Sequence, residues 1–364
     1  LKNLPSSEES RERADQILFI KNMLWELYSG NDEIRKFFDE NVAQFNGRSG
    51  DPESFNALDR LLAQQFYRLS FWKVATEEIN YRRFFNINDL ISLRVEDSRV
   101  FEATHALLFR LVREGKISGL RIDHIDGLYD PATYLKRLRE MSGDCYVVVE
   151  KILDMEESLP DQWPVCGTTG YDFTNYVNGL FCQTRHEREF SDFYARFTGF
   201  QTPYAELVSE KKRLIIGKHM AGDVDRLAHL LKRISSRDRF GGDITLYGLK
   251  RALVEVLTFF PVYRSYISQD SFSAEDRQRI QEALNKAKEM NPSLLYELAF
   301  IEKFLLLEYG EHTAAEEKTQ WVHFAMRLQQ LTGPLMAKGF EDTTLYLYNR
   351  LLSLNEVAGN PGRF

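Results

Sequence analysis

Two short β-branched segments separated by one helical segment constrain the fold of this chain more than any other feature. The segments are residues 117–123 and 145–150, and residues 131–141 between them carry apolar side chains at helical spacing. This order is typical of a β-α-β unit, in which the two strands run parallel. Both strands end in ionisable residues at the carboxyl edge, where parallel sheets and barrels place their reactive groups. The sequence therefore predicts an α/β fold with a site at that edge.

The other parts of the chain have mainly helical periodicity. We expect one helix over residues 6–45, beginning at Ser6–Glu9, and another over residues 98–115. Residues 185–330 are predicted to be helical, with one possible strand at residues 257–267. The chain thus combines a small parallel sheet with a larger amount of helix.

Charge and residue counts exclude several function classes. The 47 Lys and Arg against 54 Asp and Glu give a net charge of −7, and the chain has no basic tract, which argues against nucleic-acid or anionic-membrane partners. No apolar run approaches the roughly 18 residues of a membrane span, and no secretory leader is recognisable, so we expect a cytoplasmic protein. Cys145, Cys166 and Cys182 form no C-x-x-C pair, and the histidines lack ligand spacing. We expect neither a metal nor another cofactor.

The alternation of side chains along the two predicted strands places Asp123 and Glu150 in different surroundings. Arg121 and Asp123 share one face of the first strand, so the guanidinium can hold the carboxylate ionised. Glu150 shares its face with Val148 and Tyr146, an apolar setting that raises a carboxyl pKa. An ionised nucleophile beside a protonated acid is the arrangement of a retaining glycosidase, with carboxyl groups about 5–5.5 Å apart.

Each of these residues also has a structural alternative. Asp123 or Glu150 alone could be a strand-end charge in an ordinary ion pair. His124 and Asp126 could contact substrate hydroxyls or could cap the turn toward Gly127. It is the combination of residues on adjacent strand ends that favours a catalytic site.

Longer stretches resemble one enzyme family. Residues 119–124 (GLRIDH) and 147–153 (VVVEKIL) are similar to the second and third signature regions of the α-amylase superfamily, glycoside hydrolase family 13. More narrowly, four stretches in order resemble the maltooligosyltrehalose synthases, the (1→4)-α-D-glucan 1-α-D-glucosylmutases. These stretches are residues 79–93, 119–131, 150–173 and 333–357.

The resemblance implies a reaction and a set of site residues. The family converts the reducing-end α-1,4 linkage of a maltooligosaccharide into an α,α-1,1 linkage, a step of trehalose biosynthesis. Asp123 would be the nucleophile, Glu150 the general acid/base and Arg121 the holder of the nucleophile. The residues implied on the substrate side are His124, Lys151, Arg83, Phe84, Phe85, Trp163, Tyr171, Lys338 and Asp342. A single aromatic residue among them could equally belong to the core, and Asp342 could be a helix-terminal charge.

The resemblance also implies a partial (β/α)₈ TIM barrel from strand four onward with a large α-helical insertion. We expect residues 1–184 to form a barrel segment with N-terminal helices, residues 185–330 a helical subdomain, and residues 331–364 a return to the barrel. The family's first and fourth signatures, the latter with a third carboxylate, are not found in the sequence. We expect them in flanking segments. This segment alone is therefore expected to be inactive, with strand edges that those segments or an oligomer would cover.

Two other functions remain open from the sequence. An α-amylase-type hydrolase or transglycosylase would use the same pair of carboxylates and would differ in its products. A non-catalytic glucan-binding module would tolerate replacement of Asp123 or Glu150 and would depend on its aromatic side chains. The presence of both strand-end carboxylates favours an enzyme.

Overall fold

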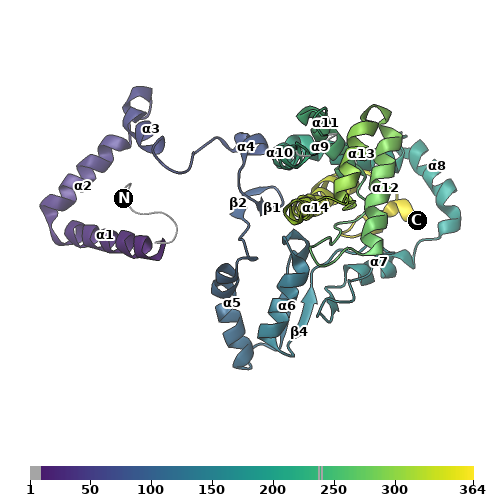
Figure 1. Ribbon diagram of the computed structural model, residues 1–364, viewed down its shortest axis with the longest axis horizontal. Helices are drawn as coiled ribbons and strands as arrows, with labels where there is room; N and C mark the ends of the chain where they lie inside the picture. Colours follow the sequence, from purple (N-terminus) through teal and green to yellow (C-terminus); the bar gives the residue numbers. More distant parts are fainter. Residues whose placement is uncertain (1–9, 237, 239–240) are drawn as a thin grey trace. The chain divides into compact units, whose positions relative to one another are not determined.

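The computed structural model describes residues 10–236, 238 and 241–364, drawn in Figure 1. The chain divides into two compact units, one ending at Phe71 and one beginning at Trp72. The helix start predicted at Ser6–Glu9 lies outside the described residues. Within the described residues, none of the helices has both the length and the apolar character that a membrane crossing requires.

The first unit is helical, but the single helix expected up to residue 45 is wrong. It consists of α1 (Ser10–Gly30) and α2 (Asp32–Phe45), which are separated at Asn31. The Asn31 side chain accepts hydrogen bonds from the backbone N–H groups of Glu33 and Ile34, at 2.9 and 3.1 Å. Asparagine is among the best N-cap residues because its side chain satisfies such free donors, so it begins a new helix. A shorter helix, α3 (Asn56–Leu62), follows.

The second unit contains the predicted β-α-β motif, which is confirmed. Strands β3 (Gly119–Ile122) and β4 (Tyr146–Val149) pair in parallel, with Arg121 opposite Val148, and α6 (Pro131–Ser142) connects them. A third parallel strand, β5 (Gly167–Thr168), pairs with the other edge of β4. A parallel sheet with a connecting helix is the α/β arrangement that the sequence predicts. The barrel itself stays a prediction. The domain boundaries at residues 184 and 330 also stay predictions.

A hydrophobic core packs against one face of this sheet. Leu120 of β3 and Val147 and Val149 of β4 are buried there. Opposite them lie Leu135 and Leu138 of α6 together with two phenylalanines of α5 (Ser98–Arg113). Burial of each such side chain stabilises the fold by roughly 1.5–3 kcal/mol. The core therefore holds the strand ends, and the carboxylates that follow them, in a fixed place.

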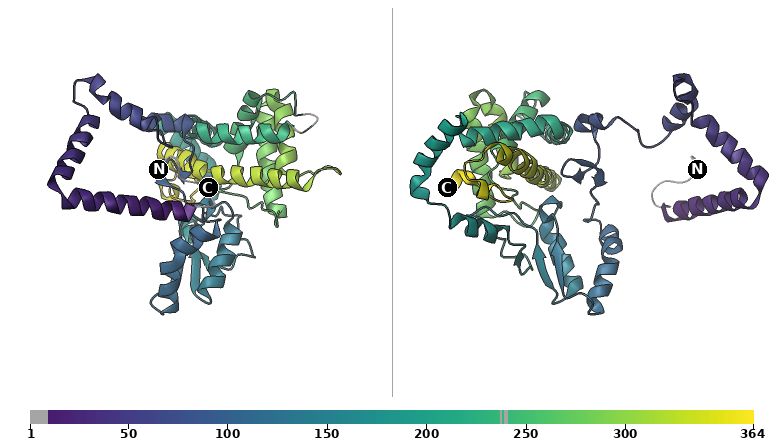
Figure 2. Two further views of the ribbon diagram at one scale, coloured as in Figure 1. Left: turned by 60° about the vertical axis from the view of Figure 1, so that its left-hand side comes forward. Right: turned by 180° about the vertical axis from the view of Figure 1, so that it is seen from behind.

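The rest of the second unit is mainly helical, and several of its helices share a second, larger core. Figure 2 shows these helices in green to yellow-green, packed side by side. They are α9 (Tyr204–His219), α10 (Ala221–Ser235), α11 (Leu246–Phe259), α12 (Ala274–Met290), α13 (Leu295–Leu305) and α14 (Ala315–Leu335). Two further helices, α7 (Tyr171–Gly179) and α8 (Glu187–Thr198), precede them in the chain. The helical character predicted for this region is confirmed.

The strand considered at residues 257–267 is wrong. Helix α11 continues to Phe259, and the following residues form an irregular segment between α11 and α12. Pro261 has no N–H to donate to a sheet, and side chains of α14 replace the missing strand partner. Gln329 accepts from the Ile267 N–H at 2.6 Å, and Thr332 donates to the Tyr263 carbonyl at 2.7 Å. The backbone groups of a buried segment are thus satisfied without a sheet.

Helix α14 continues into a widened helical segment, Met336–Thr344, that has π-helix geometry. The Thr343 hydroxyl donates to the Lys338 carbonyl at 2.6 Å, a bond that fits the wider i to i−5 spacing. Buried within it, Glu341 accepts a hydrogen bond of 2.5 Å from the Tyr263 hydroxyl. Such segments are uncommon and are frequently found at functional sites.

Candidate active site

The two predicted carboxylates converge on one guanidinium. Arg121 Nη1 lies 2.5 Å from Asp123 Oδ1, and Arg121 Nη2 lies 3.8 Å from Glu150 Oε1. Since one side chain reaches both, the carboxylates stand side by side at the carboxyl ends of β3 and β4. The pairing of Arg121 with Asp123 that strand alternation predicts is confirmed. The carboxylate separation of about 5–5.5 Å stays a prediction.

The two carboxyl groups differ in their surroundings. The Asp123 side chain is 57% exposed and that of Glu150 is 24% exposed. Burial raises the pKa of Glu150, and the negative charge of Asp123 raises it further, while the His124 N–H and Arg121 oppose the shift. A carboxyl group with a raised pKa keeps its proton at higher pH and can act as a general acid. This asymmetry suits two different chemical roles.

His124 occupies a strained backbone position between the two strand ends. Its φ of 51° is in the left-handed region, which costs a non-glycine residue roughly 1–3 kcal/mol. In this conformation its N–H donates to Glu150 Oε2 at 2.6 Å. Its imidazole contacts Phe84 and Phe85, with ring centroids 4.9 and 4.5 Å away. Burial lowers the pKa of His124, so the ring is neutral and part of an aromatic wall.

The widened segment after α14 reaches this aromatic wall. Lys338 Nζ lies 5.1 Å from the centre of the Phe85 ring and 2.5 Å from Asp342 Oδ2. A cation over a ring face is attracted by the ring quadrupole. The structure therefore brings Lys338 and Asp342 close to Phe85 and His124, although they are distant in sequence.

A cavity of about 800 Å³ opens beside these residues. This volume is within the range of roughly 300–1,000 Å³ that is usual for small-molecule sites. Asp123 and His124 form one part of its wall, and α10 and α14 form another. Further lining residues include Tyr81, Arg82, Phe85, Tyr129, His323 and Arg327. Aromatic faces alternating with hydrogen-bond donors are suited to a polyhydroxylated ligand.

Arg83 also lines the cavity, but its guanidinium is hydrogen-bonded to other protein groups. It donates to the His219 carbonyl at 2.5 Å and to the Asn86 carbonyl at 3.3 Å, and it also bonds the Asn88 side chain. Tyr171 begins α7 and is close enough to contribute to the raised pKa of Arg121, after the larger effect of Asp123. It therefore lies near Asp123 and Glu150.

Two residues expected on the substrate side are placed elsewhere. Lys151 has no exposed side-chain area, and its polar contacts are to protein groups. Trp163 is 5% exposed and packs in the sheet core, with its ring centre 4.9 Å from that of Tyr266. Burial argues against a sugar contact for either side chain. Trp163 belongs to the hydrophobic core, which was the alternative to a substrate contact for an aromatic residue. Lys151 belongs to a buried polar network.

Sequence reasoning missed most of that network. Asp126 lies in the turn Ile125–Gly127, as one of its two alternatives predicts, and it is also buried and accepts a hydrogen bond from the Tyr266 hydroxyl. Arg264, Tyr266 and Glu157 were not predicted to matter. One signal was present: Arg264 is a charged residue inside the apolar run FPVYRSYI, which indicates a buried and paired cation.

Comparisons with known proteins identify relatives of one kind. A protein of Mycobacterium tuberculosis assigned as a maltooligosyl trehalose synthase is 36% identical over 305 residues, which are 83% of this chain and 36% of the relative. The solved maltooligosyltrehalose synthase of Arthrobacter ramosus superposes with a TM-score of 0.72 at 35% identity, over 87% of this chain and 37% of that one. The chain is a homologue of the maltooligosyltrehalose synthases.

A second solved structure supports this relationship. The DSM5389 glycosyltrehalose synthase superposes with a TM-score of 0.64 at 37% identity, over 85% of this chain and 35% of that chain. No family model matches the chain. The chain spans about a third of the length of the synthases it matches.

Proposed function

We propose that the protein converts the reducing-end α-1,4 linkage of maltooligosaccharides into an α,α-1,1 linkage, as a step of trehalose biosynthesis. The observation that carries the proposal is the convergence of Asp123 and Glu150 on Arg121, in a homologue of the maltooligosyltrehalose synthases. Glycoside hydrolase family 13 is the corresponding superfamily assignment.

The first half of the reaction uses both carboxyl groups. Asp123, which accepts a hydrogen bond from Arg121, attacks the anomeric carbon and forms a glycosyl-enzyme ester. Glu150 gives its proton to the departing glycosidic oxygen, so the reducing-end glucose leaves with a free hydroxyl. The raised pKa of Glu150, caused mainly by its burial, supports this role.

The second half joins the same glucose again. Its anomeric hydroxyl attacks the anomeric carbon of the glycosyl-enzyme, the bond to Asp123 breaks, and Glu150 takes back the hydroxyl proton. The product has lost its reducing end, while no water has been consumed. The two half-reactions return both carboxyl groups to their starting states.

This outcome requires that the freed glucose is retained and water kept away. The rings of Phe84, Phe85 and His124 are in mutual contact beside the carboxylates. Such rings can cover the apolar face of a glucose and offer no nucleophile. Lys338 and Asp342, at the edge of the same wall, are proposed to contact its hydroxyls.

Product analysis of the full-length protein tests the proposal. Incubation with maltopentaose is expected to remove reducing ends with little release of glucose, and Asp123→Asn is expected to abolish conversion. Asp144→Asn is the matched control, because Asp144 is exposed and lies before the amino end of β4.

Other results would contradict parts of the proposal. Net formation of reducing sugar would indicate an α-amylase-type hydrolase. Full activity of Asp123→Asn would remove the nucleophile assignment. Glucan binding without any conversion, unaffected by Glu150→Gln, would indicate a binding module.

A further inference from the structure

The ammonium group of Lys151 joins the two loops that follow the catalytic strands. Its Nζ lies 3.2 Å from Asp126 Oδ2, in the loop after β3, and 3.2 Å from Glu157 Oε1, in the loop after β4. It also donates to the Ile152 carbonyl at 2.7 Å. The three charged side chains are almost completely buried. Lys151 directly follows Glu150, so this contact lies next to the proposed acid/base.

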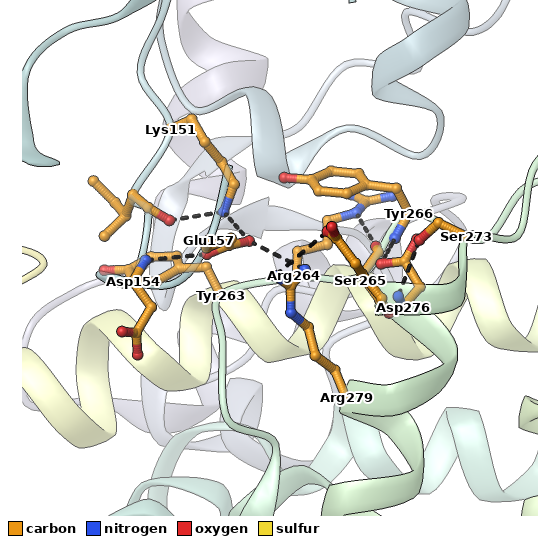
Figure 3. A network of polar contacts seen from close by, with 12 residues as sticks. Lys151, Asp154, Glu157, Tyr263, Arg264, Ser265, Tyr266, Ser273, Asp276 and Arg279 are labelled. Atoms are coloured by element: carbon orange, nitrogen blue, oxygen red, sulfur yellow. Dashed lines mark hydrogen bonds and ion pairs between the residues drawn. The ribbon is translucent and has the colours of Figure 1, made fainter. Parts of the chain in front are cut away.

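The buried charges around Lys151 are compensated. Burial lowers the pKa of Lys151, but the carboxylates of Asp126 and Glu157 outweigh this effect, and the net pKa is raised. The ammonium is therefore charged throughout the neutral range. Glu157 has a second cation, Arg279 of α12, at 3.8 Å (Figure 3). Removal of the Lys151 charge leaves two buried carboxylates with fewer compensating partners and favours rearrangement.

The same network fixes the loop after β3. The fully buried guanidinium of Arg264 donates to the carbonyls of Asp126, Leu128 and Tyr129, and the Tyr266 hydroxyl bonds the Asp126 carboxylate. Figure 3 shows Arg264 and Tyr266 near Lys151 and Glu157. The loop that they hold begins at the residue whose N–H binds Glu150.

We propose that Lys151 is a positioning residue for Glu150. By binding Asp126 and Glu157 together, it sets the relative position of the two loops and keeps the His124 N–H directed at Glu150 Oε2. Lys151 touches no substrate in this role and acts through the two loops. The inference rests on the proposed function, because it assigns Glu150 as the acid/base.

Steady-state kinetics of Lys151→Met in the full-length protein test this role. Methionine keeps the buried aliphatic volume and removes the charge, so the loops lose their common ligand. We expect kcat to fall about 100-fold, the effect of a misplacement of roughly 1 Å, while KM changes much less. Lys151→Arg retains a cation that can bridge both carboxylates and is expected to recover part of kcat.

The pH profile separates positioning from a general loss of structure. The His124 N–H lowers the pKa of Glu150, so loss of this bond should move the limb that reports Glu150 to higher pH. Arg121, Asp123 and Tyr263, which also interact with Glu150, are not substituted in this variant. A purely structural defect lowers the amount of active protein and leaves the profile where it is.

Lys212→Met is the matched control. Lys212 is also buried, but it lies in α9 and donates to the Phe260 carbonyl, at 2.9 Å. We expect this variant to keep the wild-type pH profile. If Lys151→Met does not fold, Glu157→Gln, which keeps shape and removes one charge from the same network, takes its place and should show the same shift in smaller measure.

The outcomes distinguish this role from the proposed function. An unshifted profile and unchanged kcat in the Lys151 or Glu157 variants, with an active wild type, would refute positioning alone. A shift of the same size in Lys212→Met would refute it as well. A wild-type protein that forms no α,α-1,1 product would overturn the proposed function and, with it, the role of Lys151.

Discussion

Glu341 should make the stability of the protein fall as the pH rises from 5 to 8. Its carboxyl group is buried in the widened segment after α14, and this burial raises its pKa to about 7 from an ordinary value of 4.5. The folded protein therefore holds the proton between these two values, where the unfolded chain has released it. The contribution of Glu341 to the free energy of unfolding is therefore greatest below pH 4.5, and it decreases as the pH rises to 7.

The size of the effect follows from the two pKa values. One unit corresponds to 1.36 kcal/mol, so the full difference is worth about 3 kcal/mol, most of which falls between pH 5 and pH 8. The Tyr263 hydroxyl and the Ala358 N–H donate hydrogen bonds to the carboxylate and lower its pKa, and the value of about 7 already contains their effect. Glu341→Gln is neutral at every pH and should lose this part of the pH dependence.

Urea unfolding at pH 5, 6, 7 and 8, followed by near-ultraviolet circular dichroism, measures the difference. The free energy of unfolding of wild type, minus that of Glu341→Gln, should decrease by about 2–3 kcal/mol from pH 5 to pH 8. Glu206→Gln in α9 is the control, because Glu206 is exposed, and it should follow the wild type. Parallel curves for wild type and Glu341→Gln would refute the reasoning.

Three further substitutions have defined outcomes. Gly127→Ala places a Cβ against the His124 imidazole, so the imidazole and the backbone N–H of His124 should both move. The kcat on maltopentaose should then fall at least tenfold, and an unchanged kcat would contradict the proposed site. Leu135→Ala removes a fully buried side chain from the sheet core and should lower the free energy of unfolding by about 2–5 kcal/mol in urea titrations; a loss under 1 kcal/mol would be unexpected. Asn31→Ala removes the N-cap of α2 and should cost roughly 1 kcal/mol, seen as reduced thermal stability of helical circular dichroism at 222 nm.

The β-α-β motif and the carboxylate pair could be predicted from sequence because both depend on short-range patterns. Alternation in β3 places Arg121 and Asp123 on one face, and the parallel pairing follows from the length of the connection through α6. Glu150 then falls beside Asp123 because equivalent ends of parallel strands meet at one edge. No long-range information is needed for this part of the site.

Burial of charge could not be predicted in the same way. Lys151 follows Glu150 in a motif that suggests an accessible site, and only partners far along the chain remove it from solvent. Arg264, in the irregular segment between α11 and α12, is fully buried beside the same loop. The pattern of residues along the sequence does not indicate which cation pairs with which carboxylate. These contacts can therefore be identified only from the three-dimensional structure. The helix break at Asn31 depends on one capping side chain, whereas the prediction of a single helix over residues 6–45 used only the spacing of apolar residues.

The buried network has a consequence for exchanging parts between homologues. Arg264 and Tyr266 precede α12 and Arg279 lies within it, yet all three support loops that carry the carboxylates. A chimaera that takes its α-helical region from one parent and its sheet from another would break this charge arrangement unless residues 264–279 and residues 126–157 come from the same source. Substitutions within these two stretches should therefore be inherited together, and a recombination point between them should give folded but poorly active hybrids.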